Sequence, residues 1–158
     1  MTSILAAVLS AVVTAGAQQK TPDFSGMWVL AKDRSSQTTS GSVVVSVSGL
    51  LGDKFSAVQD AKTLTLTRLQ GDQTVTETVN LDGSETREMI EALGGTRERV
   101  SRATWDGNKL VINATLSVDG KILQQNRVMS MEGGNLVIEQ IGPGGGGPAT
   151  IRRVFKKG

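Results

Sequence analysis

Hydrophobic and polar residues alternate along most of this chain, with a period of two residues. Residues 62–69 place Leu64 and Leu66 on one face and threonines on the other, and residues 73–81 repeat the pattern. Such alternation is typical of β-strands that bury one face. It predicts further strands at residues 109–118, 121–131, 135–141 and 149–155.

Short turn signals separate the predicted strands. Asp-Gly pairs at 82–83, 106–107 and 119–120 supply the positive φ that two-residue hairpins require, and a glycine-rich loop occupies 142–148. Most turns recur about every 11 to 14 residues, a spacing typical of an all-β sandwich or barrel. No long helical pattern separates the strands, so we expect an antiparallel rather than a parallel sheet.

Two stretches fit this pattern less well. Residues 35–52 are rich in Ser, Thr and Gly, and we interpret them as a long mobile loop with one short strand near Val43. Residues 85–93 place Met89, Ile90 and Leu93 at helical spacing, which suits one short helix. The preceding Asp-Gly turn favours instead a short strand from Ser84 that is followed by a loop.

The first residues have the features of an export signal. Residues 4–13 are apolar, but a membrane span needs about 20 such residues, so no stable membrane anchor is expected. Ala15 and Ala17 form the small-x-small pattern of a cleavage site. We predict a signal peptide at 1–17, a single domain at 18–158, and a periplasmic or extracellular location. No Lys or Arg precedes the apolar run, and the alternative is an N-terminal element of the domain.

The composition excludes several kinds of chemistry. The chain has no cysteine and no histidine, which excludes disulfides, thiolate or imidazole metal sites and a Ser-His-Asp triad. Ser-x-x-Lys is absent, and carboxylates are not paired by spacing. We therefore predict a protein that is not an enzyme and that has no metal and no cofactor.

The charge pattern argues against a nucleic-acid partner. The formal net charge is only +2, too small for a dense basic stripe along a phosphate backbone. One basic cluster comprises Arg97, Arg99 and Arg102, and a second occupies 152–157. We interpret both as solvated strand edges and a solubilising tail.

The opening of the predicted domain, residues 23–30, contains Gly26-Met27-Trp28. It resembles the first strand of lipocalin-like proteins, which carries a Gly-x-Trp. Residues 59–68, 81–85, 103–112 and 150–157 are similar to segments of small exported bacterial lipocalin-like proteins of unknown function. The resemblance covers most of residues 18–158.

The resemblance implies an up-and-down β-barrel of roughly eight to ten strands, closed so that few sheet edges remain. It implies that Gly26 and Trp28 form a structural motif at the closed end, with Arg153 across the Trp28 ring. Arg152 is the alternative. The absence of cysteines and of a clear C-terminal helix leaves open a fatty-acid-binding-like or an avidin-like barrel.

A barrel of this size either fills with side chains or holds one small ligand. The faces expected to point inward are mostly aliphatic, with Ile122 and Val128 among them. Four polar side chains are expected on the same faces, where burial without partners is costly. If the faces are reversed, these side chains lie outside. The candidate ligand pocket comprises Leu66, Arg68, Glu77, Ile112, Gln124 and Asn126.

These observations favour an exported, non-enzymatic barrel that binds a small, largely apolar molecule. The alternative is a structural or protein-interaction module of the cell envelope with an occluded core. A third hypothesis is a lipocalin-type enzyme that uses Asp, Glu or Arg. The sequence leaves the oligomeric state open.

Overall fold

The computed structural model describes residues 20–34, 36–38, 51–92, 95–144 and 147–158. Within these residues, the antiparallel all-β fold predicted from the alternation is confirmed. The part of the chain described here contains no helix of the length and apolarity needed to cross a membrane. The elements are β1 (Gly26–Leu30), the 3-10 helix η1 (Lys32–Arg34), β2 (Ser36–Thr38), β3 (Lys54–Gln59), β4 (Thr63–Gln70), β5 (Gln73–Asn80), β6 (Glu85–Ala92), β7 (Gly95–Asp106), β8 (Lys109–Val118), β9 (Lys121–Glu132), β10 (Asn135–Gly144) and β11 (Gly147–Lys157).

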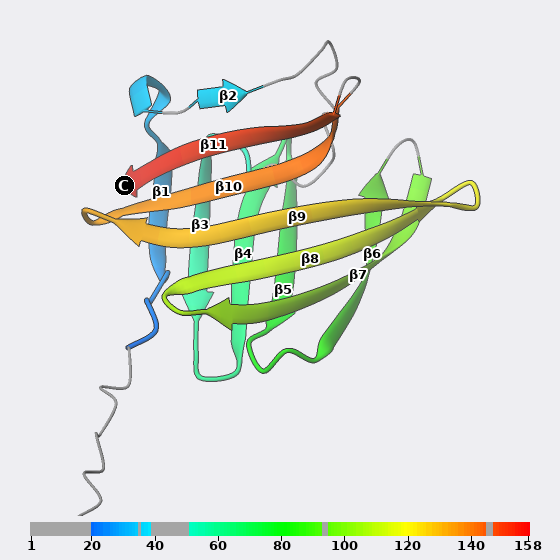
Figure 1. Ribbon diagram of the computed structural model, residues 1–158, viewed down its shortest axis with the longest axis horizontal. Coiled ribbons are helices and arrows are strands. Elements are labelled where there is room, and N and C mark those ends of the chain that lie inside the picture. Colours follow the sequence, from blue (N-terminus) through cyan, green and yellow to red (C-terminus); the bar gives the residue numbers. More distant parts are fainter. Residues whose placement is uncertain (1–19, 35, 39–50, 93–94, 145–146) are drawn as a thin grey trace, which may run out of the picture.

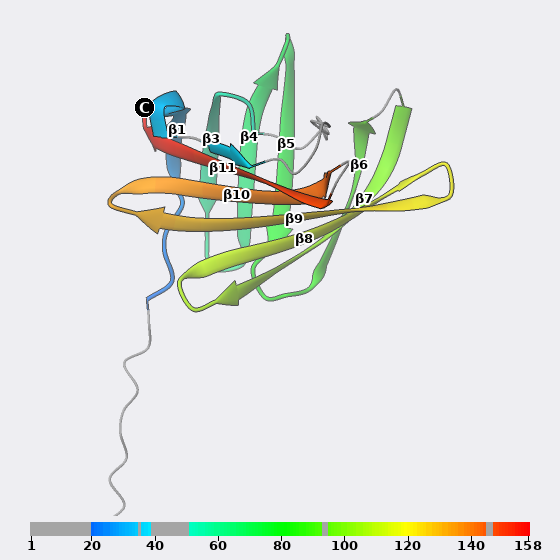
Figure 2. The same ribbon diagram turned by 45° about the horizontal axis from the view of Figure 1, so that its top comes forward.

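The strands form one sheet that curls into a nearly closed barrel. Its order is β5-β4-β3-β1-β11-β10-β9-β8-β7-β6, and β2 adds to β11 off this path. Two hairpin meanders, β3–β5 and β6–β11, are therefore joined by β1, which pairs with both β3 and β11. Figures 1 and 2 show β3–β5 as one wall that runs across the wall formed by β8–β11.

The structure corrects the sequence prediction at residues 85–92, at residues 36–38 and in the loop expected at 142–148, where β10 pairs with β11 from Gly142↔Ala149 to Gly144↔Gly147. Two predicted features lie outside the described residues. Residues 85–92 are a full strand, not a short strand followed by a loop, because β6 pairs with β7 from Glu85↔Arg102 to Ala92↔Gly95. Part of the expected 35–52 loop forms β2, and the Val43 region lies outside the described residues. The predicted signal peptide at 1–17 also lies outside them.

One end of the barrel is closed by a packed apolar core. We call it the closed end; it holds the β7–β8 and β9–β10 turns, and the opposite end is the open end. Phe24 and Trp28 are fully buried there, and the Trp28 Nε1 donates to the Phe24 carbonyl at 2.8 Å. Phe24 stacks on Trp105 with ring centroids 5.9 Å apart. Gln59 fixes the segment before β1, because it accepts from Phe24 N and donates to the Pro22 carbonyl.

The cation over Trp28 is Lys157, not Arg153 or Arg152. Lys157 Nζ lies 5.6 Å from the centre of the Trp28 ring. The β1–β11 register pairs Trp28 with Lys157, so Arg153 lies two inward positions closer to the open end. Arg153 lies instead over Phe155, 5.3 Å from its ring centre. Arg152 points outward and pairs with Glu132 at 2.7 Å.

Gly26 explains why glycine precedes the tryptophan in this motif. Its φ is +142°, a conformation that side-chain-bearing residues rarely adopt. A Cβ at this position would lie 3.5 Å from Lys157 Cε. That distance is an ordinary van der Waals contact, so the backbone conformation, and not a lack of space, favours glycine here.

Replacing Lys157 by Met removes the charge over Trp28 and keeps an aliphatic chain. We expect the free energy of unfolding to fall by about 0.5–1 kcal/mol, the value of an exposed cation–π contact. Lys156→Met, at the adjacent position paired with Val29, is the matched control and is expected to change stability by less than about 0.5 kcal/mol. Urea unfolding measures both, and equal losses would contradict the assignment.

Candidate ligand-binding site

Charged side chains fill the barrel interior between the apolar core and the open end. We call Arg68, Glu77, Glu88, Arg99 and Arg127 the inner charge cluster. Glu77, Arg99 and Arg127 are only 2%, 4% and 7% exposed. The strand registers place Leu66 opposite Glu77 and Ile112 opposite Arg127, so the cluster lies directly on the apolar core.

Glu77 is the centre of this cluster. Its carboxylate oxygens lie 3.5 Å from Arg99 Nη2 and 3.1 Å from Arg127 Nη1. The same Arg99 Nη2 lies 2.6 Å from Glu88 Oε2. Burial by itself raises the pKa of Glu77, but Arg127 and Arg99 outweigh this effect, and the pKa lies below its usual range. Glu77 is therefore ionised and paired.

The cluster carries one positive charge in excess, with three guanidinium groups against two carboxylates. Arg68 is the third guanidinium. Burial lowers its pKa; Glu77 raises it, and the nearby Arg127 and Arg99 lower it. Since arginine stays protonated in proteins, this crowding does not remove the charge.

Two more inward arginines lie toward the rim, and each pairs with an exposed carboxylate. Arg97 Nη2 lies 3.6 Å from Asp119 Oδ1, and Arg153 Nη2 lies 3.0 Å from Asp53 Oδ1. Because their partners are exposed, these two pairs are solvated and contribute little to stability. They do not neutralise the inner charge cluster.

Three buried polar atoms in this region have no hydrogen-bond partner among the described residues: Arg97 Nε, Arg99 Nε and Ser101 Oγ. They belong to successive inward positions of β7, and Ser101 is only 1% exposed. Leaving a buried donor unsatisfied costs about 1–3 kcal/mol. The inner face of β7 therefore offers hydrogen bonds to a water or a ligand acceptor.

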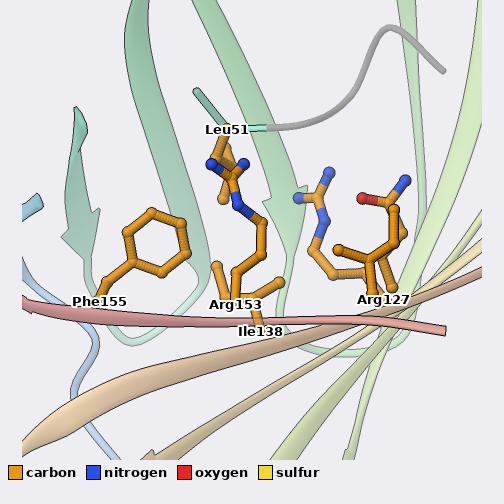
Figure 3. A pocket seen from close by; sticks show the side chains of 7 residues that line it. Leu51, Arg127, Ile138, Arg153 and Phe155 are labelled. Atoms are coloured by element: carbon orange, nitrogen blue, oxygen red, sulfur yellow. The ribbon is translucent and has the colours of Figure 1, made fainter. Parts of the chain in front are cut away.

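Two small cavities lie in the interior, each of about 10 Å³. One is seen in Figure 3, where Arg153 and Phe155 of β11 and Arg127 of β9 point into the same space. The other is lined by Glu77, Arg99 and Gln125, among others. A volume of about 10–15 Å³ holds a single water molecule.

Two larger clefts open beside the β4–β5 hairpin, and Arg68 lines both of them. The rim cleft has a volume of about 420 Å³ and includes Phe55, Lys54 and Leu69. The seam cleft has a volume of about 280 Å³ and reaches Arg99. These volumes fall near the lower end of small-ligand sites, about 300–1,000 Å³.

The structure brings together four of the six candidate pocket residues. Leu66, Glu77 and Ile112 are buried, and Arg68 shares their inward face. Gln124 and Asn126 do not share it: Gln124 is exposed, and Asn126 is half-buried and lines the second small cavity.

The strand face expected for β9 is therefore wrong. Its inward residues are Leu123, Gln125, Arg127 and Met129, and Ile122 is 69% exposed. Between residues 122 and 129 each face of β9 carries two aliphatic and two polar side chains, so alternation does not choose between them. The register with β8, which pairs Leu110 with Met129, decides the face.

Sequence reasoning missed Glu88, Arg99 and Arg127. Arg99 was assigned to a solvated strand edge, yet it is almost fully buried. The sequence does contain a signal for this burial. Arg99 is separated from Ala103 and Trp105 by even numbers of residues, so in a strand all three lie on the same face, which is the inward face of β7. Among the described residues, no group of three or more Asp, Glu, His or Cys is placed to hold a metal ion.

Comparison with known proteins gives the fold. No protein-family model matches the chain, and a search of curated proteins finds no match. Among solved structures, zebrafish ileal bile acid-binding protein complexed with cholic acid is 21% identical, with a TM-score of 0.57 over 85% of this chain and 98% of that chain. The fluorescent protein UnaG, as a mutant, is 20% identical, with a TM-score of 0.55 over 85% and 96%. The REP1-NXSQ fatty acid transporter is 12% identical, with a TM-score of 0.54 over 85% and 95%.

These similarities extend over nearly the whole of each neighbour, so the likeness concerns the fold of the barrel as a whole. The fold is a nearly closed, antiparallel up-and-down β-barrel.

Replacing Glu77 by Gln leaves Arg99 and Arg127 buried without their shared anion. We expect the free energy of unfolding to fall by about 3–5 kcal/mol, as when one partner of a buried ion pair is removed. The control is Glu98→Gln on the outward face of β7, where an exposed pair with Arg87 contributes about 0–1 kcal/mol. Equal losses in urea unfolding would contradict the assignment.

The same variant tests the pKa direction. Because folding lowers the pKa of Glu77 from its ordinary 4.5, its contribution to stability is complete above that value. It is lost as the pH falls through the folded-state pKa. The stability difference between wild type and Glu77→Gln is therefore expected to narrow below about pH 4.5. Comparison with the variant isolates Glu77 from Glu88, and a constant difference would contradict the assignment.

Proposed function

We propose that this protein binds a small, largely apolar molecule with one acidic group, and that it takes up this molecule in the open half of the barrel. The single positive charge in excess within the inner charge cluster carries this proposal. A charge buried in a low-dielectric interior is costly unless it is paired. One anionic group would neutralise the cluster and accept from Arg99 Nε, the donor of the cluster that lacks a partner among the described residues.

The surroundings of the cluster suit an apolar body on such a ligand. The apolar core residues Leu66, Ile112 and Ile138 adjoin the cluster, and Phe155 lines the small cavity that Arg127 also lines. The seam cleft supplies space at the open end, next to Arg68 and Arg99. The names of two structural neighbours, a bile acid-binding protein with cholic acid and a fatty acid transporter, refer to apolar acids and support the same class of ligand.

The proposal includes a non-enzymatic role. The names of those neighbours describe binding and transport. General acid–base catalysis works best with a group that titrates near the working pH. The inner charge cluster instead contains arginines and a carboxylate whose pKa is lowered, which suit fixed charges rather than proton transfer.

A specific observation favours a second candidate, a structural module with an occluded core. The two interior cavities hold about one water each, and the closed end is packed with side chains that water does not reach. On this alternative the arginines stabilise the barrel and bind no ligand. The two candidates differ in whether an apolar anion binds.

We expect the protein to bind anilinonaphthalene sulfonate more tightly than the uncharged analogue N-phenylnaphthylamine, because only the sulfonate compensates the excess charge. Arg68→Gln should weaken sulfonate binding by about tenfold, or 1.4 kcal/mol, and leave the uncharged probe unaffected. Arg87→Gln, on the outer face of β6, is the control. Fluorescence titration of the wild type and both variants with the two probes measures all six affinities.

Each other outcome has a defined meaning. Equal affinity for both probes would contradict the proposal that the ligand carries an acidic group. It would still support binding of an apolar molecule. An equal loss in Arg87→Gln would show that the charge acts at the outer surface. Binding of neither probe would overturn the proposal in favour of the occluded core.

Export to the periplasm or the cell exterior is part of the proposal and rests on the apolar run at 4–13 with Ala15 and Ala17. Cleavage after Ala17 would leave Gln18 as the first residue. The intact mass of the protein isolated from its own host is expected to match residues 18–158. A mass that includes residues 1–17 would contradict the prediction.

A further inference from the structure

Strands β5 and β6 form a seam in the barrel, because they are the two ends of the strand path and share no backbone ladder. In Figures 1 and 2 they lie next to each other with no other strand between them. Side-chain oxygens of β6 accept the hydrogen bonds from β5 backbone N–H groups that backbone carbonyls would accept in a regular ladder. Thr86 Oγ1 accepts from Asn80 N at 3.2 Å, and Glu88 Oε1 accepts from Thr78 N at 2.8 Å.

Beyond Glu88, toward the open end, the seam cleft separates the two strands. Its outer wall includes Met89, which is 66% exposed, and its inner end reaches Arg99, which is 4% exposed. Val75 of β5 and Ile90 of β6 give it apolar sides. The cleft therefore leads from solvent, past an apolar surface, to a guanidinium of the inner charge cluster.

Glu88 contacts Arg99 at the inner end of this cleft and accepts two hydrogen bonds there. One carboxylate oxygen accepts from the Thr78 backbone, and the other accepts from Arg99 Nη2 at 2.6 Å. Among the hydrogen bonds of the described residues, the bond to Thr78 is the last across the seam before the cleft. An anion can bind Arg99 at Nε, which is unpartnered within the described part of the chain, whereas an anion that approaches Nη2 competes with the Glu88 carboxylate.

The rim cleft is a less suitable route to the cluster. Most of its side chains, including Ser56, Thr67 and Leu69, belong to the outer faces of β1, β3, β4 and β5. Arg68 is the cluster member on its lining, and Arg99 is not part of it. It provides an alternative that the experiment must distinguish.

We propose that the ligand enters and leaves through the side of the barrel, between β5 and β6, and that Glu88 is the residue that closes this route. The apolar part of the ligand lies in the seam cleft when the acidic group is on Arg99. This inference rests on the proposed function and deepens it.

Changes at Glu88 test the closing residue. Stopped-flow fluorescence with anilinonaphthalene sulfonate is expected to show that Glu88→Ala raises both association and dissociation rates about tenfold, since it removes a charge-assisted hydrogen bond. Glu88→Gln keeps an acceptor for Thr78 and should give an intermediate increase. Glu98→Ala on the outward face of β7 is the control. Unchanged rates in both Glu88 variants, with native circular dichroism, would overturn the assignment.

Blocking the cleft tests the route. The chain has no cysteine, so Met89→Cys reacts at one position with a bulky polyethylene glycol maleimide. The adduct is expected to slow probe association and dissociation about tenfold or more, while the unlabelled variant exchanges normally. Ile122→Cys, at an equally exposed position on the β8–β9 hairpin, is the matched control, and Leu69→Cys probes the rim cleft.

The outcomes separate the two proposals. Slow exchange only in the Met89→Cys adduct supports the lateral route. Slow exchange only in the Leu69→Cys adduct, or in neither adduct, overturns the lateral route. If the wild type still binds the probe at equilibrium, the proposed function stands. A wild type that binds no probe at equilibrium overturns the proposed function, and the lateral route with it.

Discussion

The interior of this barrel depends on the buried ion pairs between the Glu77 carboxylate and the guanidinium groups of Arg99 and Arg127. Moving a carboxylate and two guanidinium groups out of water is costly, and only their mutual pairing offsets that cost. The pairing has a geometric requirement, because Glu77 and the two arginines come from β5, β7 and β9. The charged half of the interior thus restricts how these strands can lie relative to one another.

Apolar burial at the closed end offsets the free-energy cost of the buried charges. The aromatic and aliphatic side chains around Trp28 are removed from water completely, and burial of a large apolar side chain contributes about 1.5–3 kcal/mol. The two ends of the barrel therefore have different roles. The closed end supplies stability through apolar burial, and the other half holds buried charges whose pairing the fold must maintain.

The fold was predictable because strand alternation and turns are local signals. Where one face was clearly aliphatic, as in β4 and β8, the inward residues followed from the sequence. In β9 the two faces are equally mixed, and only pairing with β8 selects Arg127 over Asn126. The cation over Trp28 likewise depends on the β1–β11 register, which no local pattern contains.

The candidate site was less predictable, because it is assembled from single residues on different strands. Arg68 and Glu77 lie on neighbouring strands, and their parity was readable from the sequence. Arg99 and Glu88 were not found, since a charged residue is usually exposed and the 85–93 segment was assigned mostly to a loop. Only the pairing of β6 with β7 places Glu88 opposite Arg99.

Arg99 connects stability with access to the interior. Its Nη2 lies within reach of Glu77 on β5 and Glu88 on β6, the two strands that share no backbone ladder. A regular ladder there would fix the strands through backbone bonds that no ligand could replace. Here the two strands are connected through side chains, and such a connection can be exchanged. In the proposed route, a ligand anion takes the position of the Glu88 carboxylate at Arg99. The excess positive charge then has a consequence for dynamics as well as for binding: the group that neutralises it is also the group that competes for the bond across the seam.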